Sequence, residues 1–170
     1  MHHKVETGYN KKMKDLIVVA GAPGSGKTTV LNILQEKLAS PRVNIGKLRE
    51  FHLKRDWSNA TKDEENMTFD SLVYILRNYI KHGYKNVFVE DLEDDKVQKI
   101  SELFNDDNFL IVSLILASDD ELKKRVLGGR DSGYKNVEAA TAWNKNLIKR
   151  APVKNEVRLD NIHNDPEKTA

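Results

Sequence analysis

Residues 16–29 read LIVVAGAPGSGKTT, and this stretch decides the fold. Its first five residues are apolar and suit a strand buried in a parallel sheet. The pattern Gly-x-x-x-x-Gly-Lys-Thr follows from Gly21 to Thr28 and is typical of a phosphate-binding loop, or P-loop. Apolar residues then recur at helical spacing, at Val30, Leu31, Leu34 and Leu38. The sequence therefore predicts a strand, a P-loop and a helix in that order.

The P-loop pattern predicts nucleotide binding because each residue type in it has a chemical use. Its glycines tolerate positive φ and leave room for a phosphate, so that backbone N–H groups converge at the start of a helix. Lys27 is expected to reach the β- and γ-phosphates, and the hydroxyl of Thr28 is expected to bind Mg²⁺. The predicted nucleotide site consists of Gly21, Ala22, Pro23, Gly24, Ser25, Gly26, Lys27, Thr28 and Thr29.

Composition describes an ordinary globular protein of 170 residues, with 39% hydrophobic and 32% charged residues. The formal net charge is only +2, so we expect no extended basic surface and no nucleic-acid partner. The chain has no cysteine, which excludes a disulfide framework and a thiolate metal site. No apolar run approaches the roughly 18 residues of a membrane span, and no signal peptide is evident, so the expected location is the cytoplasm.

The chain is expected to form one domain over residues 13–170. Residues 1–12 include His2 and His3 and are interpreted as a disordered or tag-derived extension. Strands and helices alternate after the P-loop, which predicts a three-layer α/β fold with a five-stranded parallel sheet and helices on both faces. The ligand should bind beyond the carboxyl ends of the strands. Further strands are expected at 43–45, 86–90, 109–116 and 156–159, and further helices at 51–55, 61–82, 97–104, 118–128 and 136–149.

The strand, P-loop and helix, together with the stretch from Leu122 to Tyr134, resemble the adenylate kinase and shikimate kinase group of small P-loop kinases. In adenylate kinases a similar arginine-containing stretch leads into a mobile lid. The resemblance implies a small lid at 128–150, with Arg125 on the base side of ATP and Arg130 as a phosphate clamp. A planar guanidinium can stack on a ring and bind phosphate oxygens with two nitrogens. The match carries one extra residue between the two arginines, so the lid geometry is implied only approximately.

The resemblance also implies an acceptor-binding region at 47–82. The stretch from Gly46 to Arg49 is similar to the Gly-Asp-x-x-Arg element of adenylate kinases, in which the arginine holds the acceptor phosphate. Here Lys47 replaces the acid, so a nucleoside monophosphate acceptor is in doubt. Arg55 and Trp57 lie in the same region and are further candidates for substrate binding. The acidic pattern of shikimate kinases after the second strand is absent, which disfavours shikimate as the acceptor.

Two acids follow the third predicted strand, at Glu90 and Asp91. A carboxylate at the end of that strand would face the γ-phosphate, where it could hold Mg²⁺ through water or accept a proton from an acceptor hydroxyl. We therefore include both as catalytic candidates with Lys27 and Arg130, and slightly prefer Asp91. The alternative is a solvated loop that caps the next helix, which is the interpretation given to Glu93, Asp94 and Asp95.

Three functions are compatible with these motifs. The first is an ATP-dependent kinase that passes the γ-phosphoryl group to a small-molecule acceptor. The second is a nucleotide-binding switch or slow ATPase that acts on a protein partner. The third, a kinase for nucleic-acid ends, requires a basic groove and is the weakest. The acceptor and the oligomeric state do not follow from the sequence.

Overall fold

The computed structural model describes residues 13–54, 60–104, 108–128, 134–163 and 165–170. Within these residues the chain forms a five-stranded sheet in the order β2-β3-β1-β4-β5, and all neighbouring strands are parallel. The predicted α/β class with a parallel sheet is confirmed. The strands are β1 (Leu16–Ala20), β2 (Arg42–Asn44), β3 (Val87–Glu90), β4 (Phe109–Ile115) and β5 (Glu156–Asp160).

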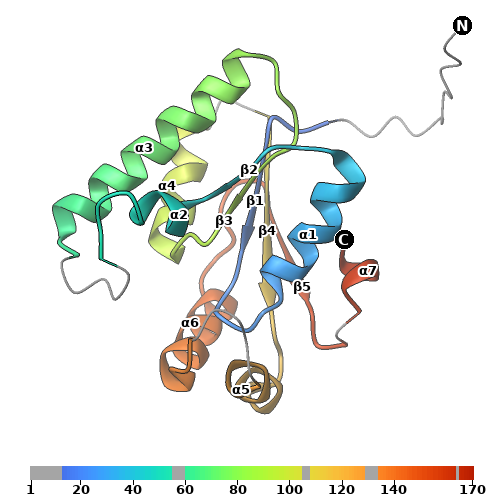
Figure 1. The fold of residues 1–170 in the computed structure, drawn as a ribbon. Coiled ribbons are helices and arrows are strands. Elements are labelled where there is room, and N and C mark those ends of the chain that lie inside the picture. Colours follow the sequence, from blue (N-terminus) through green and yellow to red (C-terminus); the bar gives the residue numbers. More distant parts are fainter. Residues whose placement is uncertain (1–12, 55–59, 105–107, 129–133, 164) are drawn as a thin grey trace, which may run out of the picture.

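Helices cover both faces of the sheet, as predicted. Figure 1 shows α1 and α7 on one face and α3 and α4 on the other, with α5 and α6 together beyond the carboxyl ends of the strands. The short α2 lies against α3. The described helices are α1 (Lys27–Leu38), α2 (Ile45–Arg49), α3 (Lys62–Lys81), α4 (Asp94–Leu103), α5 (Asp119–Leu127), α6 (Val137–Lys149) and α7 (Pro166–Thr169).

The strand residues divide between two cores because successive side chains point to opposite faces of a sheet. Leu16 and Val18 of β1 join the larger cluster, which also contains Leu72 of α3 and Ile100 of α4. Val19 joins the smaller cluster, which α1 completes. The P-loop connects β1 to α1 at the carboxyl edge of the sheet, so both cores hold the strand before it and the smaller core holds the helix after it.

The start of α3 follows its local sequence signal. The hydroxyl of Thr61 accepts a hydrogen bond from the backbone of Glu64, whose carboxylate accepts one from the backbone of Thr61. This is a capping box, whose Thr-x-x-Glu spacing is present in the sequence, and it satisfies two amide groups that a helix start otherwise leaves unpaired. Gly83 has a φ of 79° after the helix ends, as a C′ glycine requires.

The region after β2 corrects one prediction. We expected a strand at 43–45 and a helix at 51–55, whereas β2 ends at Asn44 and the helix occupies Ile45–Arg49. The reason is the Asn44 side chain, which accepts a hydrogen bond from the backbone of Lys47 at 3.1 Å and so caps α2 early. Phe51 lies in the turn after α2, with its side chain 85% exposed.

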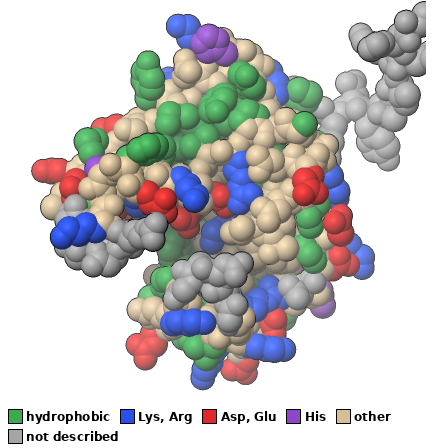
Figure 2. All heavy atoms as spheres, viewed as in Figure 1, with side chains coloured by type: hydrophobic (Ala, Val, Ile, Leu, Met, Phe, Trp, Pro, Cys, Tyr) green, Lys and Arg blue, Asp and Glu red, His purple; other side chains and the backbone are tan. Residues whose placement is uncertain are grey.

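Charged side chains of both signs are interspersed on the face shown in Figure 2, in agreement with the small net charge. None of the helices among the described residues has the length and apolar character that crossing a bilayer would require.

Candidate functional site

The P-loop has a conformation that only glycine accommodates at three positions. Gly21, Gly24 and Gly26 have φ of 139°, 95° and 97°. A Cβ atom on Gly21 would lie 2.4 Å from the backbone oxygen of Leu114, which cannot move without disturbing β4. The glycines therefore allow the loop to pack closely on the sheet and to turn its backbone amides outward.

The polar groups of the P-loop fit a polyphosphate. Lys27 Nζ donates hydrogen bonds to the backbone oxygens of Gly21 at 2.8 Å and Ala22 at 3.1 Å, so the ammonium group lies over the loop. The hydroxyl of Ser25 is buried and has no hydrogen-bond partner among the described residues. Thr28 and Thr29 are exposed at the first turn of α1. A phosphate bound in the loop would accept hydrogen bonds from backbone N–H groups and from the Lys27 ammonium group.

Glu90 lies at the end of β3 and is held by β2. Its carboxylate accepts two hydrogen bonds from Arg42, from Nε at 2.8 Å and Nη2 at 2.7 Å, and one from Asn44 Nδ2 at 2.9 Å. The Glu90 side chain is 6% exposed. Arg42 also donates to Asn32, which lies one turn after Thr28 on α1. Glu90 is therefore a rigidly placed carboxylate on the α1 side of the sheet.

Asp91 follows Glu90 but has different surroundings. Its φ of 67° is in the left-handed region, which Asp tolerates better than most residues. Strained backbone of this kind is common at functional sites. The Asp91 side chain is exposed and lies near Gly46, since a Cβ built on Gly46 would be 2.9 Å from Asp91 Oδ2. The two acids therefore differ in their surroundings: Glu90 is held by Arg42 and Asn44, whereas Asp91 is exposed beside Gly46 of α2.

Arg49 is buried between helices. Its guanidinium donates to Glu65 Oε2 of α3 at 3.0 and 2.8 Å and lies 3.8 Å from Glu93 Oε1. Only 3% of the Arg49 side chain is exposed. Two carboxylates already neutralise this cation, so the structure gives Arg49 a role in joining α2 to α3 and to the start of α4.

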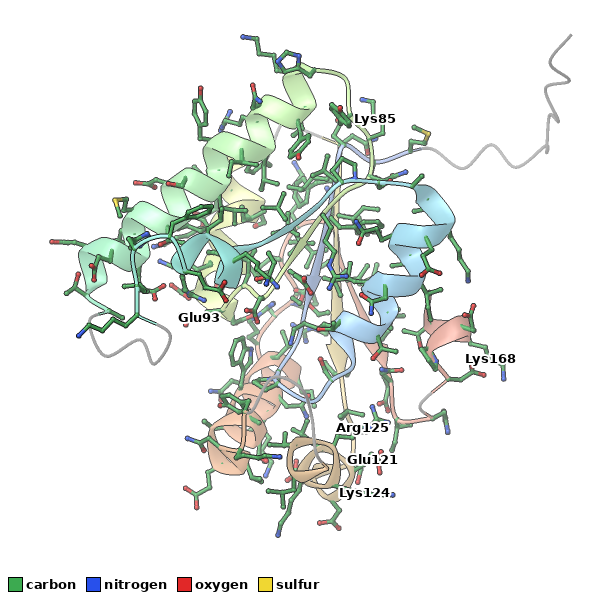
Figure 3. The ribbon with its side chains drawn as sticks, in the orientation of Figure 1. Lys85, Glu93, Glu121, Lys124, Arg125 and Lys168 are labelled. Atoms are coloured by element: carbon green, nitrogen blue, oxygen red, sulfur yellow. The ribbon has the colours of Figure 1, made fainter. Side chains whose placement is uncertain are left out.

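Arg125 connects α5 to the segment after β5. Its Nε donates to Glu121 at 2.7 Å, and its Nη2 donates to the backbone oxygen of Ile162 at 3.1 Å. The hydrogen bond from Arg125 lowers the pKa of Glu121 below its ordinary value. Figure 3 shows Glu121 and Arg125 side by side on α5. If the adenine ring of ATP binds between α5 and the segment at Ile162, these two hydrogen bonds already hold the Arg125 guanidinium in a fixed orientation beside it.

A cluster of ion pairs around Arg150 lies where α4, α6 and β5 meet. Arg150 donates to Asp94 at 2.8 Å and to Glu156 at 2.7 Å, and Ser113 donates to Glu156 at 2.5 Å. Burial raises the pKa of Glu156, but hydrogen bonds from Arg150 and Ser113 outweigh this effect and hold the pKa below its ordinary value. Burial likewise lowers the pKa of Arg150, and its two carboxylate partners reverse the direction to a net increase.

Some predicted residues fall outside the part of the chain that the structure describes. These are Arg55, Trp57 and Arg130, with residues 1–12 of the proposed extension. Within the described part, no group of three or more His, Asp or Glu side chains could hold a metal ion. Thr28 is therefore the metal candidate supported by motif, in a site where phosphate oxygens and water would supply most ligands to Mg²⁺.

The sequence did not reveal the residues that position Glu90 and the P-loop. Arg42 and Asn44 hold Glu90, and Asn161 donates to the Ser25 backbone oxygen at 2.8 Å. The alternation of β2 could have suggested that Arg42 and Asn44 share a face. Nothing in the local sequence pairs Asn161 with the P-loop.

Comparisons with known proteins show the family of the chain and its fold. The family model described as "AAA domain" matches residues 17–144. Two curated relatives named "Putative adenylate kinase" are similar to part of the chain. The relative from Pyrococcus abyssi is 36% identical over 66 residues, which cover 39% of this chain and 35% of that protein. The relative from Pyrococcus furiosus is 37% identical over 75 residues, covering 44% and 39%. The matches thus span well under half the length of these relatives.

A solved structure of a sugar kinase from Janibacter sp. HTCC2649 shares the fold. Its TM-score is 0.63 at 15% identity, and the match covers 90% of this chain and 88% of that one. At this identity the likeness concerns the fold alone.

Proposed function

We propose that this chain, which belongs to the AAA domain family, is a small P-loop kinase that transfers the γ-phosphoryl group of ATP to a small-molecule acceptor. The observation that carries the proposal is that two features lie side by side at one sheet edge. The glycine-lined loop with Lys27 follows β1, and Glu90 and Asp91 lie at the end of β3, which pairs with β1 in parallel. Because ATP is the donor, the proposed setting is the cytoplasm.

In this proposal the P-loop binds the polyphosphate through its main chain. Backbone N–H groups of the loop residues other than Pro23 converge on the β-phosphate, and Lys27 exchanges its carbonyl partners for phosphate oxygens. The ammonium group then lies where negative charge develops on the transferred group. Because the loop is already folded around glycines, little reorganisation is needed when the nucleotide binds.

Glu90 and Asp91 have different roles in this proposal. Mg²⁺, when bound, neutralises charge on the β- and γ-phosphates. The Thr28 hydroxyl would hold the ion directly, and Glu90 would hold one of its waters, because Arg42 fixes Glu90 on the α1 side. Asp91 would accept the proton of an acceptor hydroxyl, because it is exposed and lies toward α2.

The acceptor would bind between the β3 end and the α2–α3 region, within residues 47–82. Arg49 would stiffen this region, and Arg55 and Trp57 remain candidates for direct contact with the acceptor. On the donor side Arg125 would orient the base. Arg130, within a lid at 128–150, would neutralise the transferred phosphate and close the site against water.

The test is ADP formation from Mg·ATP by the purified chain, alone and with panels of nucleoside monophosphates, sugars and polyols. We expect one chemical class to stimulate ADP formation and to appear as a phosphorylated product in mass spectrometry. ADP formation that no acceptor stimulates, and that yields no phosphorylated product, would contradict phosphotransfer to a small molecule.

A further inference from the structure

The amide of Asn161 connects the end of β5 to the P-loop. The residue is 5% exposed, and Nδ2 donates to the Ser25 backbone oxygen at 2.8 Å. The backbone N–H of Asn161 donates to Ile115 of β4 at 2.9 Å, so the sheet fixes the main chain at this residue. A side chain on a fixed strand end is a rigid support for a loop 136 residues away in sequence.

Thr169 of α7 lies beside the oxygen of this amide. Its hydroxyl is 3.0 Å from Asn161 Oδ1 and 3.0 Å from the backbone oxygen of Asp165, and its one proton can be donated to either acceptor. The Ser25 carbonyl can only accept a hydrogen bond, so Nδ2 must face it and Oδ1 must face Thr169. The Ser25 carbonyl therefore sets the orientation of the Asn161 amide, and Thr169 offers a donor to its oxygen.

The supported carbonyl belongs to the peptide unit that joins Ser25 to Gly26. In a trans peptide the C=O and N–H bonds point in opposite directions. Holding the Ser25 oxygen toward Asn161 therefore turns the Gly26 N–H away from Asn161. Gly26 lies directly against the same amide, because a Cβ there would be 2.5 Å from Asn161 Nδ2. The Asn161 amide thus sets both the direction of this peptide unit and the space beside it.

We propose that Asn161, whose oxygen can accept a hydrogen bond from Thr169, is a positioning residue for nucleotide binding that holds the Gly26 amide in the direction that a β-phosphate requires. The inference rests on the proposed function only in that the ligand is a nucleoside di- or triphosphate. Through Thr169, α7 would then affect the affinity for the nucleotide, although no α7 side chain would contact the phosphates.

The test measures Mg·ATP and Mg·ADP binding by calorimetry, and the ¹⁵N order parameter of the Gly26 amide by NMR relaxation in the nucleotide-free chain. Asn161→Ala should raise both dissociation constants by about three- to tenfold, which corresponds to the loss of one ordinary hydrogen bond. ATP and ADP should lose affinity equally because both carry the β-phosphate. The order parameter of the Gly26 amide should fall below the wild-type value, because its peptide unit loses its support.

Matched variants separate positioning from general destabilisation. Thr169→Val removes the Thr169 hydroxyl and should raise both dissociation constants by about two- to threefold, while Thr169→Ser should restore wild-type values. Lys168→Ala is the control on the same helix, because its side chain is 86% exposed and directed away from the sheet (Figure 3). Ser113→Ala removes a buried hydrogen bond to Glu156 and should lower Tm without changing either dissociation constant.

Wild-type affinity and a wild-type order parameter at Gly26 in Asn161→Ala would overturn the inference. If Asn161→Ala does not fold, Thr169→Val is the deciding variant, and unchanged affinity with an unchanged order parameter in that variant would overturn the inference. If the wild-type chain binds neither nucleotide, the proposed function fails, whereas the order parameter at Gly26 still tests the positioning role of Asn161.

Discussion

The P-loop and the carboxylate cluster, which we define as Arg42, Asn44, Glu90 and Asp91, lie at the same edge of the sheet but are held in different ways. The P-loop is shaped by main-chain conformation and close packing, with three glycines at positive φ. The carboxylate cluster is held by side-chain hydrogen bonds from one strand to its neighbour. The P-loop therefore keeps its conformation because three of its residues lack a side chain, whereas the carboxylate cluster is held by polar and charged side chains.

This difference indicates which part of the site is general and which part is particular to this chain. Main-chain amides bind any polyphosphate, and a motif at fixed spacing is sufficient to specify them. Charged side chains on separate elements can be rearranged without changing the fold. We therefore expect substitutions in the P-loop to affect donor binding, and substitutions in the carboxylate cluster to affect turnover.

Replacement of the P-loop lysine should have the largest effect. Lys27→Ala removes the ammonium group over the loop and should lower kcat/KM by about three orders of magnitude, with weaker Mg·ATP binding. Lys37→Ala is the matched control, because Lys37 lies at the last turn of the same helix and pairs with Glu167 on the surface. A Lys27→Ala variant with wild-type kinetics would remove the P-loop from the mechanism.

The ion cluster around Arg150 should show that charge, rather than main chain, joins α4, α6 and β5. The folded pKa of Glu156 is lowered, so its contribution to stability is present above its unfolded pKa and is lost as pH falls through the folded pKa. Glu156→Gln should lower the free energy of unfolding by about 3 kcal/mol at pH 7, because Arg150 loses a buried partner.

Urea titrations of both proteins between pH 7 and pH 3 measure this difference. The gap in unfolding free energy between wild type and Glu156→Gln should narrow as the pH falls below the unfolded pKa of about 4.3 for Glu. A gap that stays constant over this range would show that the charge of Glu156 does not stabilise the fold.

Substitutions at the two acids should separate their roles. Glu90→Gln and Asp91→Asn should each lower kcat by about a hundredfold while the dissociation constant of Mg-free ATP stays unchanged. Only Glu90→Gln should also raise the Mg²⁺ concentration needed for half-maximal activity, since Glu90 lies toward α1. The reverse pattern, with the Mg²⁺ requirement altered in Asp91→Asn alone, would exchange the two assignments.

The smallest expected effect is at the base side of the nucleotide. Arg125→Lys keeps the charge but loses the planar group that contacts both Glu121 and Ile162. We expect Mg·ATP affinity to fall by about threefold, close to the loss of one weak hydrogen bond. Equal loss of affinity for inorganic triphosphate would show that Arg125 does not act through the base.

The sequence was sufficient for the features that local signals encode. The strand, P-loop and helix from Leu16 to Leu38 and the capping box at Thr61 depend on spacing within one segment. The pairing of Arg42 with Glu90 spans 48 residues and depends on β2 lying beside β3. The burial of Arg49 likewise depends on where α3 lies. Such contacts arise from strand order and helix packing, which no short pattern specifies.

The central claim is that the P-loop main chain binds the polyphosphate. The most direct measurement is an amide chemical-shift titration of the ¹⁵N-labelled wild-type chain with Mg·ADP. We predict that the largest shifts occur at residues 21–29, with little change at the amides of α2 and the first turn of α3. Large shifts in α2 and α3 with an unchanged P-loop would contradict the account.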